Sequence, residues 1–170
     1  MAAIDVRKKL SGGDRRSIGA ANAVAKKAER SQDEFDRLIA GLFVENAVVR
    51  MRSADAAEKA SQKNAALLAK HKGRILRSLG QFSQQEVCWH IALMLPRLAL
   101  TKKEARRAAD VLLLWARTSE SKIVAVNALQ GLWEISAKNP GLRGEVQKLV
   151  QQFLLNGSAA LKARARKLMR

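Results

Sequence analysis

The chain has 170 residues, and its 32 Lys and Arg against 15 Asp and Glu give it a formal net charge of +17. Two prolines, no tyrosine and abundant Ala, Leu, Lys and Arg favour helices and leave little sequence suited to a sheet. A chain of this length buries about 70% of its unfolded surface, so it needs no stabilising metal, and its single cysteine excludes a disulfide framework.

Residues 1–31 differ from the rest, because glycines punctuate a basic segment there. Gly-Gly-Asp at 12–14 predicts a turn, and a helix is expected to begin near Ile18. Apolar residues then follow at helical spacing: Ile18, Ala21, Val24 and Ala25. We expect this segment to dock as an N-terminal cap on the helices that follow. The alternative is a mobile basic arm that carries Arg15 and Arg16.

From residue 32 onward a helical phrase recurs every 37 to 38 residues. Its anchors are Val49, Val87, Val124 and Leu161. A second apolar column stands eleven residues before each anchor, at Leu38, Leu76, Leu113 and Val150. Such a period is typical of stacked helix pairs. The predicted helices span residues 32–43, 46–60, 65–80, 84–98, 102–117, 121–137, 142–155 and 158–169.

Local signals indicate where several of these helices begin and end. N-caps are expected at or near Asp33, Ser83, Thr101 and Ser121, and Thr101-Lys-Lys-Glu104 resembles a capping box. Pro96 lies inside the predicted helix 84–98 and is expected to kink or end it.

The segment VVRMRSADAAEKAS at 48–61 resembles the inner helix of the HEAT family, and IVAVNALQGLWEIS at 123–136 echoes it. The second segment departs from the first, since Ala125 stands where the first has Arg50. The resemblance covers residues 32–170. It implies an all-α fold, a right-handed α-solenoid of about four HEAT-like helix pairs, with residues 1–31 as a capping segment or arm. It implies no particular activity.

The charge is unevenly distributed. Residues 31–62 carry four basic and six acidic side chains, whereas residues 63–170 carry twenty basic and six acidic ones. In the last predicted helix the apolar column Leu161, Ala165, Leu168 and Met169 is expected to pack inward. The cations Lys162, Arg166, Lys167 and Arg170 then project together, partly because the helix dipole favours cations in a last turn.

A polar column occupies the third position after each anchor, and we expect it on the concave wall of the solenoid. Its members are Arg52, His90, Asn127 and Arg164. The alternative is an ordinary solvated face of amphipathic helices. Together with the C-terminal cations and Arg15 and Arg16, this column forms the predicted binding surface.

These features predict a non-enzymatic binding scaffold whose basic surface associates with an acidic partner, either nucleic acid or an acidic protein. Lys and Arg neutralise phosphates without reading base edges, so binding to nucleic acid would be independent of sequence. The tryptophans Trp89, Trp115 and Trp133 are expected to serve packing rather than base stacking.

The alternative function is DNA repair. Some HEAT-like solenoids are DNA glycosylases that hold damaged duplex in a basic groove with Trp side chains and an Asp. Asp110 with Trp115 resembles that constellation only faintly, because a spacing of five does not place both on one helix face.

We expect no metal and no cofactor. Asp33, Glu34 and Asp36 lie in a first helical turn, where the helix dipole already explains acidic residues. His71 and His90 have no Cys or His at ligand spacing, and no glycine-rich phosphate loop follows a strand. Without a long apolar run or a signal-peptide core, and with Cys88 expected to be an inert thiol, the chain is predicted to be cytoplasmic.

Overall fold

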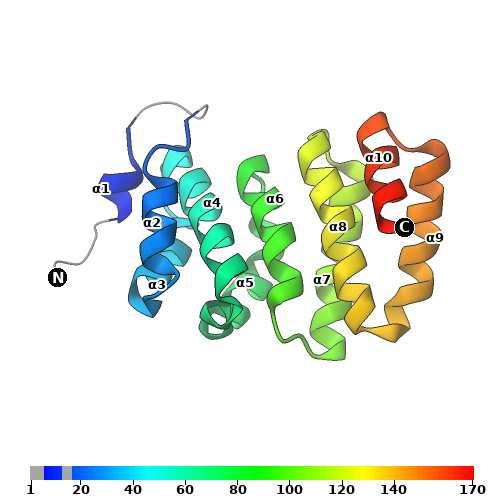
Figure 1. The fold of residues 1–170 in the computed structure, drawn as a ribbon, viewed down its shortest axis with the longest axis horizontal. Coiled ribbons are helices and arrows are strands. Elements are labelled where there is room, and N and C mark those ends of the chain that lie inside the picture. Colours follow the sequence, from blue (N-terminus) through cyan, green and yellow to red (C-terminus); the bar gives the residue numbers. More distant parts are fainter. Residues whose placement is uncertain (1–5, 13–16) are drawn as a thin grey trace. The chain divides into compact units, whose positions relative to one another are not determined.

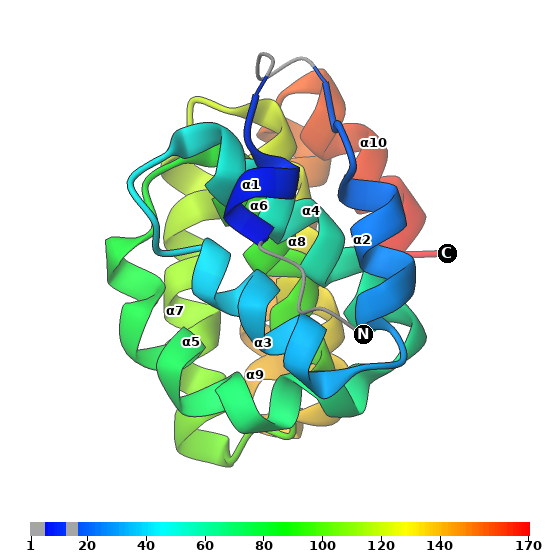
Figure 2. The same cartoon turned by 90° about the vertical axis from the view of Figure 1, so that its left-hand side faces the viewer.

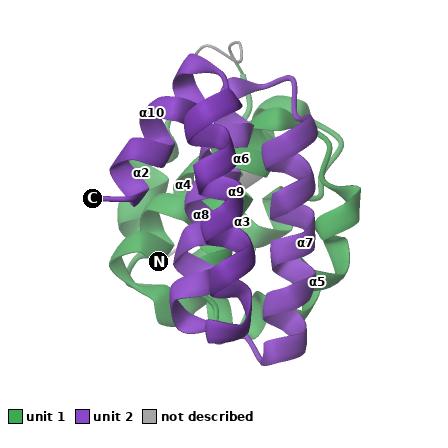
Figure 3. Cartoon of the chain, turned by 90° about the vertical axis from the view of Figure 1, so that its right-hand side faces the viewer, with its two compact units in different colours: residues 1–98 green, residues 99–170 purple. Residues whose placement is uncertain are grey.

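The computed structural model describes residues 6–12 and 17–170, and every regular element in this part of the chain is helical (Figure 1). The predicted all-α fold is therefore confirmed for the described residues. The chain divides into two compact units, residues 1–98 and 99–170, which Figure 3 colours separately.

The unit of residues 1–98 contains six α-helices and three 3₁₀ helices within its described residues. They are α1 (Val6–Leu10), α2 (Ala21–Ala28), α3 (Gln32–Gly41), α4 (Ala47–Lys63), η1 (Ala65–His71), α5 (Lys72–Ser78), η2 (Leu79–Gln81), α6 (Gln85–Met94) and η3 (Leu95–Arg97). Helix α4 is the centre of this unit, because α1, α2, α3 and α6 all pack against it.

The N-terminal helices α1 and α2 both contact α3 and α4 (Figure 2). Ala21, Val24 and Ala25 of α2 are buried, as their spacing predicted. The expectation for Ile18 is wrong, since its side chain is 46% exposed and α2 begins only at Ala21. Gly19 explains the late start: its φ of +51° is left-handed, so the helix cannot include it.

Side-chain caps mark several helix starts. Ser31 accepts a hydrogen bond from the backbone N–H of Glu34, so Ser31 and not Asp33 caps α3. Asn46 caps α4 in the same way. Gln84 precedes α6 and makes no cap with its side chain, so the expected cap at Ser83 is wrong.

The predicted helix 65–80 is broken into η1, α5 and η2. In a 3₁₀ helix, residues three apart lie above one another, and Leu68 and His71 of η1 are both buried. Pro96 acts as expected, because α6 ends at Met94 and η3 follows with the proline in its first turn.

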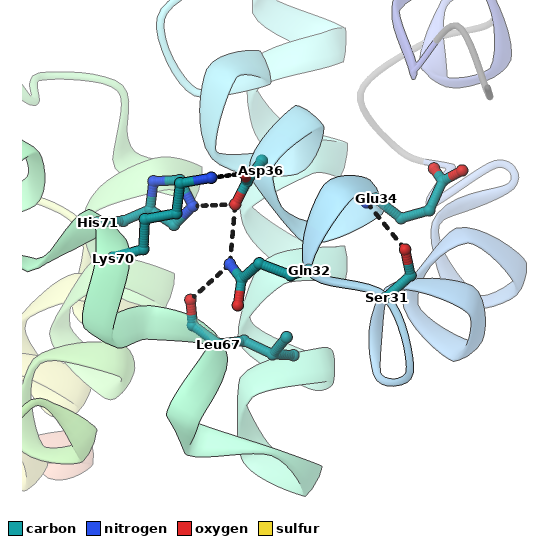
Figure 4. A network of polar contacts seen from close by, with 7 residues as sticks. All are labelled: Ser31, Gln32, Glu34, Asp36, Leu67, Lys70 and His71. Carbon is teal, nitrogen blue, oxygen red and sulfur yellow. Dashed lines mark hydrogen bonds and ion pairs between the residues drawn. The ribbon is translucent and has the colours of Figure 1, made fainter.

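A polar network joins η1 to α3 (Figure 4). Gln32 Nε2 donates to Asp36 Oδ1 (2.8 Å) and to the Leu67 carbonyl (3.1 Å). His71 Nε2 lies 2.7 Å from Asp36 Oδ1, and Lys70 pairs with Asp36 Oδ2. Burial raises the pKa of Asp36, but the hydrogen bonds from Gln32, Lys70 and His71 outweigh it and lower the pKa to about 2.

We expect Asp36→Asn to destabilise the protein by about 1 kcal/mol at neutral pH, because solvent screens part of the interaction of this partly exposed carboxylate. Because the folded pKa of Asp36 lies below its unfolded value, this contribution is present above about pH 4 and is lost as the pH falls towards about 2. Urea unfolding of wild type and variant across this range measures it. Asp33→Asn is the matched control, since Asp33 is exposed on the same helix. A cost of Asp36→Asn that does not change with pH would contradict the prediction.

The unit of residues 99–170 contains four helices: α7 (Lys102–Thr118), α8 (Lys122–Lys138), α9 (Pro140–Asn156) and α10 (Ala159–Leu168). Helix α8 packs against both α7 and α9, and α10 contacts α8 and α9 (Figure 3). The predicted capping box is confirmed, because Thr101 accepts from the Glu104 N–H while Glu104 accepts from the Thr101 N–H. Ser121 caps α8 as expected.

The four anchors of the repeated phrase are buried: Val49, Val87, Val124 and Leu161. The second column is buried at Leu38, Leu76 and Val150 but not at Leu113, which is only half-buried. Leu112 is fully buried instead. The expected column is therefore one residue out of phase in α7, because this helix turns Leu112 towards the core and Leu113 towards a groove beside α9.

We expect Leu112→Ala to cost about 2 to 5 kcal/mol of unfolding free energy, because it opens a cavity in a packed core. Leu113→Ala is expected to cost less than half as much, since its side chain already faces partly open space. Chemical denaturation of the two variants measures the difference. Equal losses, or a larger loss at Leu113, would mean that the phase of α7 is wrong.

None of the helices in the described ranges combines the length and apolar character needed to cross a bilayer.

Candidate polyanion-binding surface

Helix α10 presents one apolar and one cationic face. Ser158 accepts from the Leu161 N–H and starts the helix, while Leu161 and Ala165 are buried. Two members of the expected inward column depart from it, since Leu168 is half-buried and Met169 is 49% exposed. Met169 is the first residue after the helix, so it no longer follows the buried stripe.

The opposite side of α10 carries Lys162, Arg166 and Lys167, and a fourth cation, Arg170, follows two residues after the helix ends. Lys162 is half-buried and the other three are exposed. Within the described part of the chain, none of the four makes a hydrogen bond or an ion pair. Like charges four residues apart, as in Lys162 and Arg166, destabilise a helix by about 0.2–0.5 kcal/mol per pair. A bound anion would relieve this repulsion.

An open pocket of about 540 Å³ lies beside these cations. It is lined by Trp133 of α8, by Arg143, Gln147 and Gln151 of α9, and by residues 168–170. The guanidinium carbon of Arg143 lies 3.8 Å from the centroid of the Trp133 ring. Arg143 Nη1 also donates to Ser136 Oγ at 3.3 Å, so the Arg143 side chain is held in place from two sides.

The connection between α8 and α9 explains why these residues meet. Helix α8 ends at Lys138, and Asn139 Nδ2 donates to the Ile135 carbonyl at 2.8 Å. Pro140 then starts α9, a position that suits proline because its missing N–H would be unpaired there. This tight reversal brings the first turns of α9 alongside the last turns of α8, and Arg143 therefore faces Trp133.

The expected contact role of Arg52 is corrected by the structure, since the residue is only 3% exposed. Its guanidinium donates to the carbonyls of Leu10 (3.0 Å), Gly12 (2.6 Å) and Ser17 (3.0 Å). A Cβ at Gly19 would lie 2.9 Å from the Arg52 guanidinium carbon, so the glycine makes room for it. Arg52 thus binds the N-terminal segment to α4 and is closed to a large partner.

His90 is also unsuited to binding a polyanion. Its side chain is 12% exposed, and its Nε2 lies 3.8 Å from Asp55 Oδ1. Burial lowers the pKa of His90, although the carboxylates of Asp55 and Glu58 oppose this shift. The imidazole is therefore neutral at physiological pH and offers no positive charge.

The remaining predicted residues differ in their surroundings. Asn127 is half-buried on α8, and Arg164 donates to Gln130 Oε1 at 2.8 Å, which ties α10 to α8. Arg15 and Arg16 lie outside the described residues. The structure therefore leaves Lys162, Arg166, Lys167 and Arg170 as the accessible, unpaired part of the predicted surface.

The pocket residues were not predicted as binding residues. Arg143, Gln147 and Gln151 recur every four residues, which places them on one face of α9, and this spacing is the signal that could have indicated them. Their proximity to Trp133 depends on the reversal at Pro140 and cannot be read from spacing.

The two residues considered for the alternative function, a DNA glycosylase, lie on α7. The carboxylate of Asp110 is 58% exposed, and its Oδ1 lies 3.6 Å from Arg106, which also donates to Glu145 at 2.7 Å. Trp115 is half-buried on the same helix. Among the described residues, no cluster of three His, Cys, Asp or Glu side chains could hold a metal ion.

No family model, curated protein or solved structure matches this chain. The candidate site is thus defined by its own chemistry: three unpaired cations on α10 with Arg170 just after it, a stacked Arg–Trp pair, and two glutamine amides.

Proposed function

We propose that the protein is a non-enzymatic binding scaffold that associates with a polyanion, either nucleic acid or an acidic protein surface, through the cationic face of α10. The observation that carries this proposal is the group of four cations without a partner in the described structure. A surface evolved only for solubility would intersperse acids among them, as α7 does with Arg106, Asp110 and Glu104.

We further propose that the helices belong to a right-handed HEAT-like α-solenoid of about four pairs, capped by residues 1–31. The burial of all four repeat anchors supports this, because equivalent positions in stacked pairs face the shared core. The cytoplasm suits such a protein, since its single cysteine, the buried Cys88, allows no disulfide within the chain.

The test is a binding titration with polyanions. We expect the protein to bind duplex DNA of unrelated sequences with equal affinity and to lose affinity steeply between about 50 and 200 mM salt, because several phosphates are neutralised at once. Fluorescence anisotropy with labelled oligonucleotides measures this. No binding to DNA, RNA, heparin or polyglutamate at about 50 mM salt would contradict the proposal. Release of free purine from alkylated DNA would replace it with the glycosylase alternative.

A further inference from the structure

We propose that the polyanion is a single-stranded nucleic acid and that one of its bases binds in the pocket formed by Trp133, Arg143, Gln147 and Gln151. This inference rests on the proposed function and names its ligand. Phosphates of the same strand would then lie along the cations of α10.

The first argument is the stacked pair in the pocket. Arg143 lies over the ring of Trp133 and is held there by Ser136 before any ligand arrives. Bases of single-stranded nucleic acids stack on aromatic rings and on guanidinium planes alike. A pair fixed in advance loses little conformational freedom when a base stacks on it.

The second argument is the polar lining. Gln147 and Gln151 are exposed on the pocket side of α9, and each amide offers both donors and an acceptor. The edges of bases carry the same mixture of groups, whereas a carboxylate only accepts. The pocket volume of about 540 Å³ also falls in the range of ~300–1,000 Å³ that is usual for small-molecule sites.

The third argument is continuity between the pocket and the cations. Residues 168–170 line the pocket and directly follow Arg166 and Lys167 on α10. A strand with one base in the pocket can therefore place its neighbouring phosphates beside these side chains. In a duplex the bases are stacked inside, and an acidic peptide would use the charges but not the stacked pair.

The experiment compares two oligonucleotides of equal length and charge, an oligo-dT and its abasic counterpart, which has phosphates and sugars but no bases. We expect the wild-type protein to bind oligo-dT more tightly by on the order of tenfold, the contribution of about one stacked base. Equal affinities for the two strands, or equally tight binding of polyglutamate, would overturn the inference. The proposed function would survive either result, because it requires only salt-dependent binding of a polyanion.

Two variants locate the base. Trp133→Leu and Arg143→Lys should each remove the preference for oligo-dT while leaving the affinity for the abasic strand nearly unchanged. Arg143→Lys keeps the positive charge and the packing of Trp133. It therefore tests the pocket even if Trp133→Leu proves to be misfolded. Trp115→Leu is the matched control, because Trp115 is half-buried in the same unit and does not line the pocket. A preference that survives both pocket variants would place the base elsewhere and overturn the inference.

Discussion

Reversing three charges together, with Lys162→Glu, Arg166→Glu and Lys167→Glu, should weaken binding of duplex DNA roughly hundredfold at low salt. Each Lys or Arg beside an anionic membrane contributes about 1 kcal/mol, and we apply the same scale to a phosphate backbone; tenfold in affinity corresponds to about 1.4 kcal/mol. The slope of log affinity against log salt should also flatten by about one unit for each lost contact. Anisotropy titrations at several salt concentrations measure both quantities.

A second triple variant with the same change in net charge distinguishes binding through the α10 surface from binding through the overall charge of the protein. Lys102→Glu, Lys103→Glu and Arg107→Glu change the charge by the same amount at three exposed positions of α7. Neither set of three side chains has a hydrogen bond or ion pair within the described residues, so the comparison tests position alone. Lys162, Arg166 and Lys167 lie on α10 next to the pocket of Trp133 and Arg143, and their reversal should have much the larger effect. If both triple variants lose affinity equally, the binding depends on overall charge and the α10 surface is not the site.

Replacing Arg52 with Met should destabilise the protein by at least about 3 kcal/mol, because hydrogen bonds from a charged donor contribute ~1.5–3 kcal/mol each. Met preserves much of the side-chain length but leaves the carbonyls of Leu10, Gly12 and Ser17 without this donor. The loss should be greatest in the N-terminal segment. Thermal unfolding measures the stability, and trypsin cleavage after Lys26 or Lys27 of α2 reports local opening.

Arg77→Met is the matched control, since Arg77 is exposed on α5 and makes no hydrogen bond or ion pair with another described residue. It should change the melting temperature little. Deletion of residues 1–30 should cost at least as much stability as Arg52→Met, because it removes the carbonyls that Arg52 binds and also the packing of α1 and α2 against α4. If Arg52→Met leaves stability and proteolysis unchanged, the N-terminal segment does not depend on this side chain.

The sequence by itself determined that the chain is helical and which residues are buried at the repeat anchors. Val49, Val87 and Val124 are buried where the period predicted them, because a buried stripe follows the helical repeat within each segment. Local chemistry was equally informative at the capping box of Thr101 and at Pro96, since these signals act over a few residues.

The sequence predicted less well which side of a helix faces the core. Leu112 and Leu113 are adjacent and equally apolar, and about 100° separates them around the helix axis. Which of the two side chains enters the core depends on the orientation in which α7 packs against α8. This orientation is set by the tertiary structure of the unit. The 3₁₀ helix η1 is a similar case, because the contact between His71 and Asp36 crosses 35 residues.

Only the tertiary structure decided what each polar residue does. Arg52 and Arg166 carry the same guanidinium, yet Arg52 is closed in because carbonyl oxygens some forty residues away converge on it, while Arg166 is exposed. Arg143 meets Trp133 because the chain reverses at Pro140. Side-chain spacing places a residue on a face of its own helix, but what covers that face depends on contacts between segments distant in sequence.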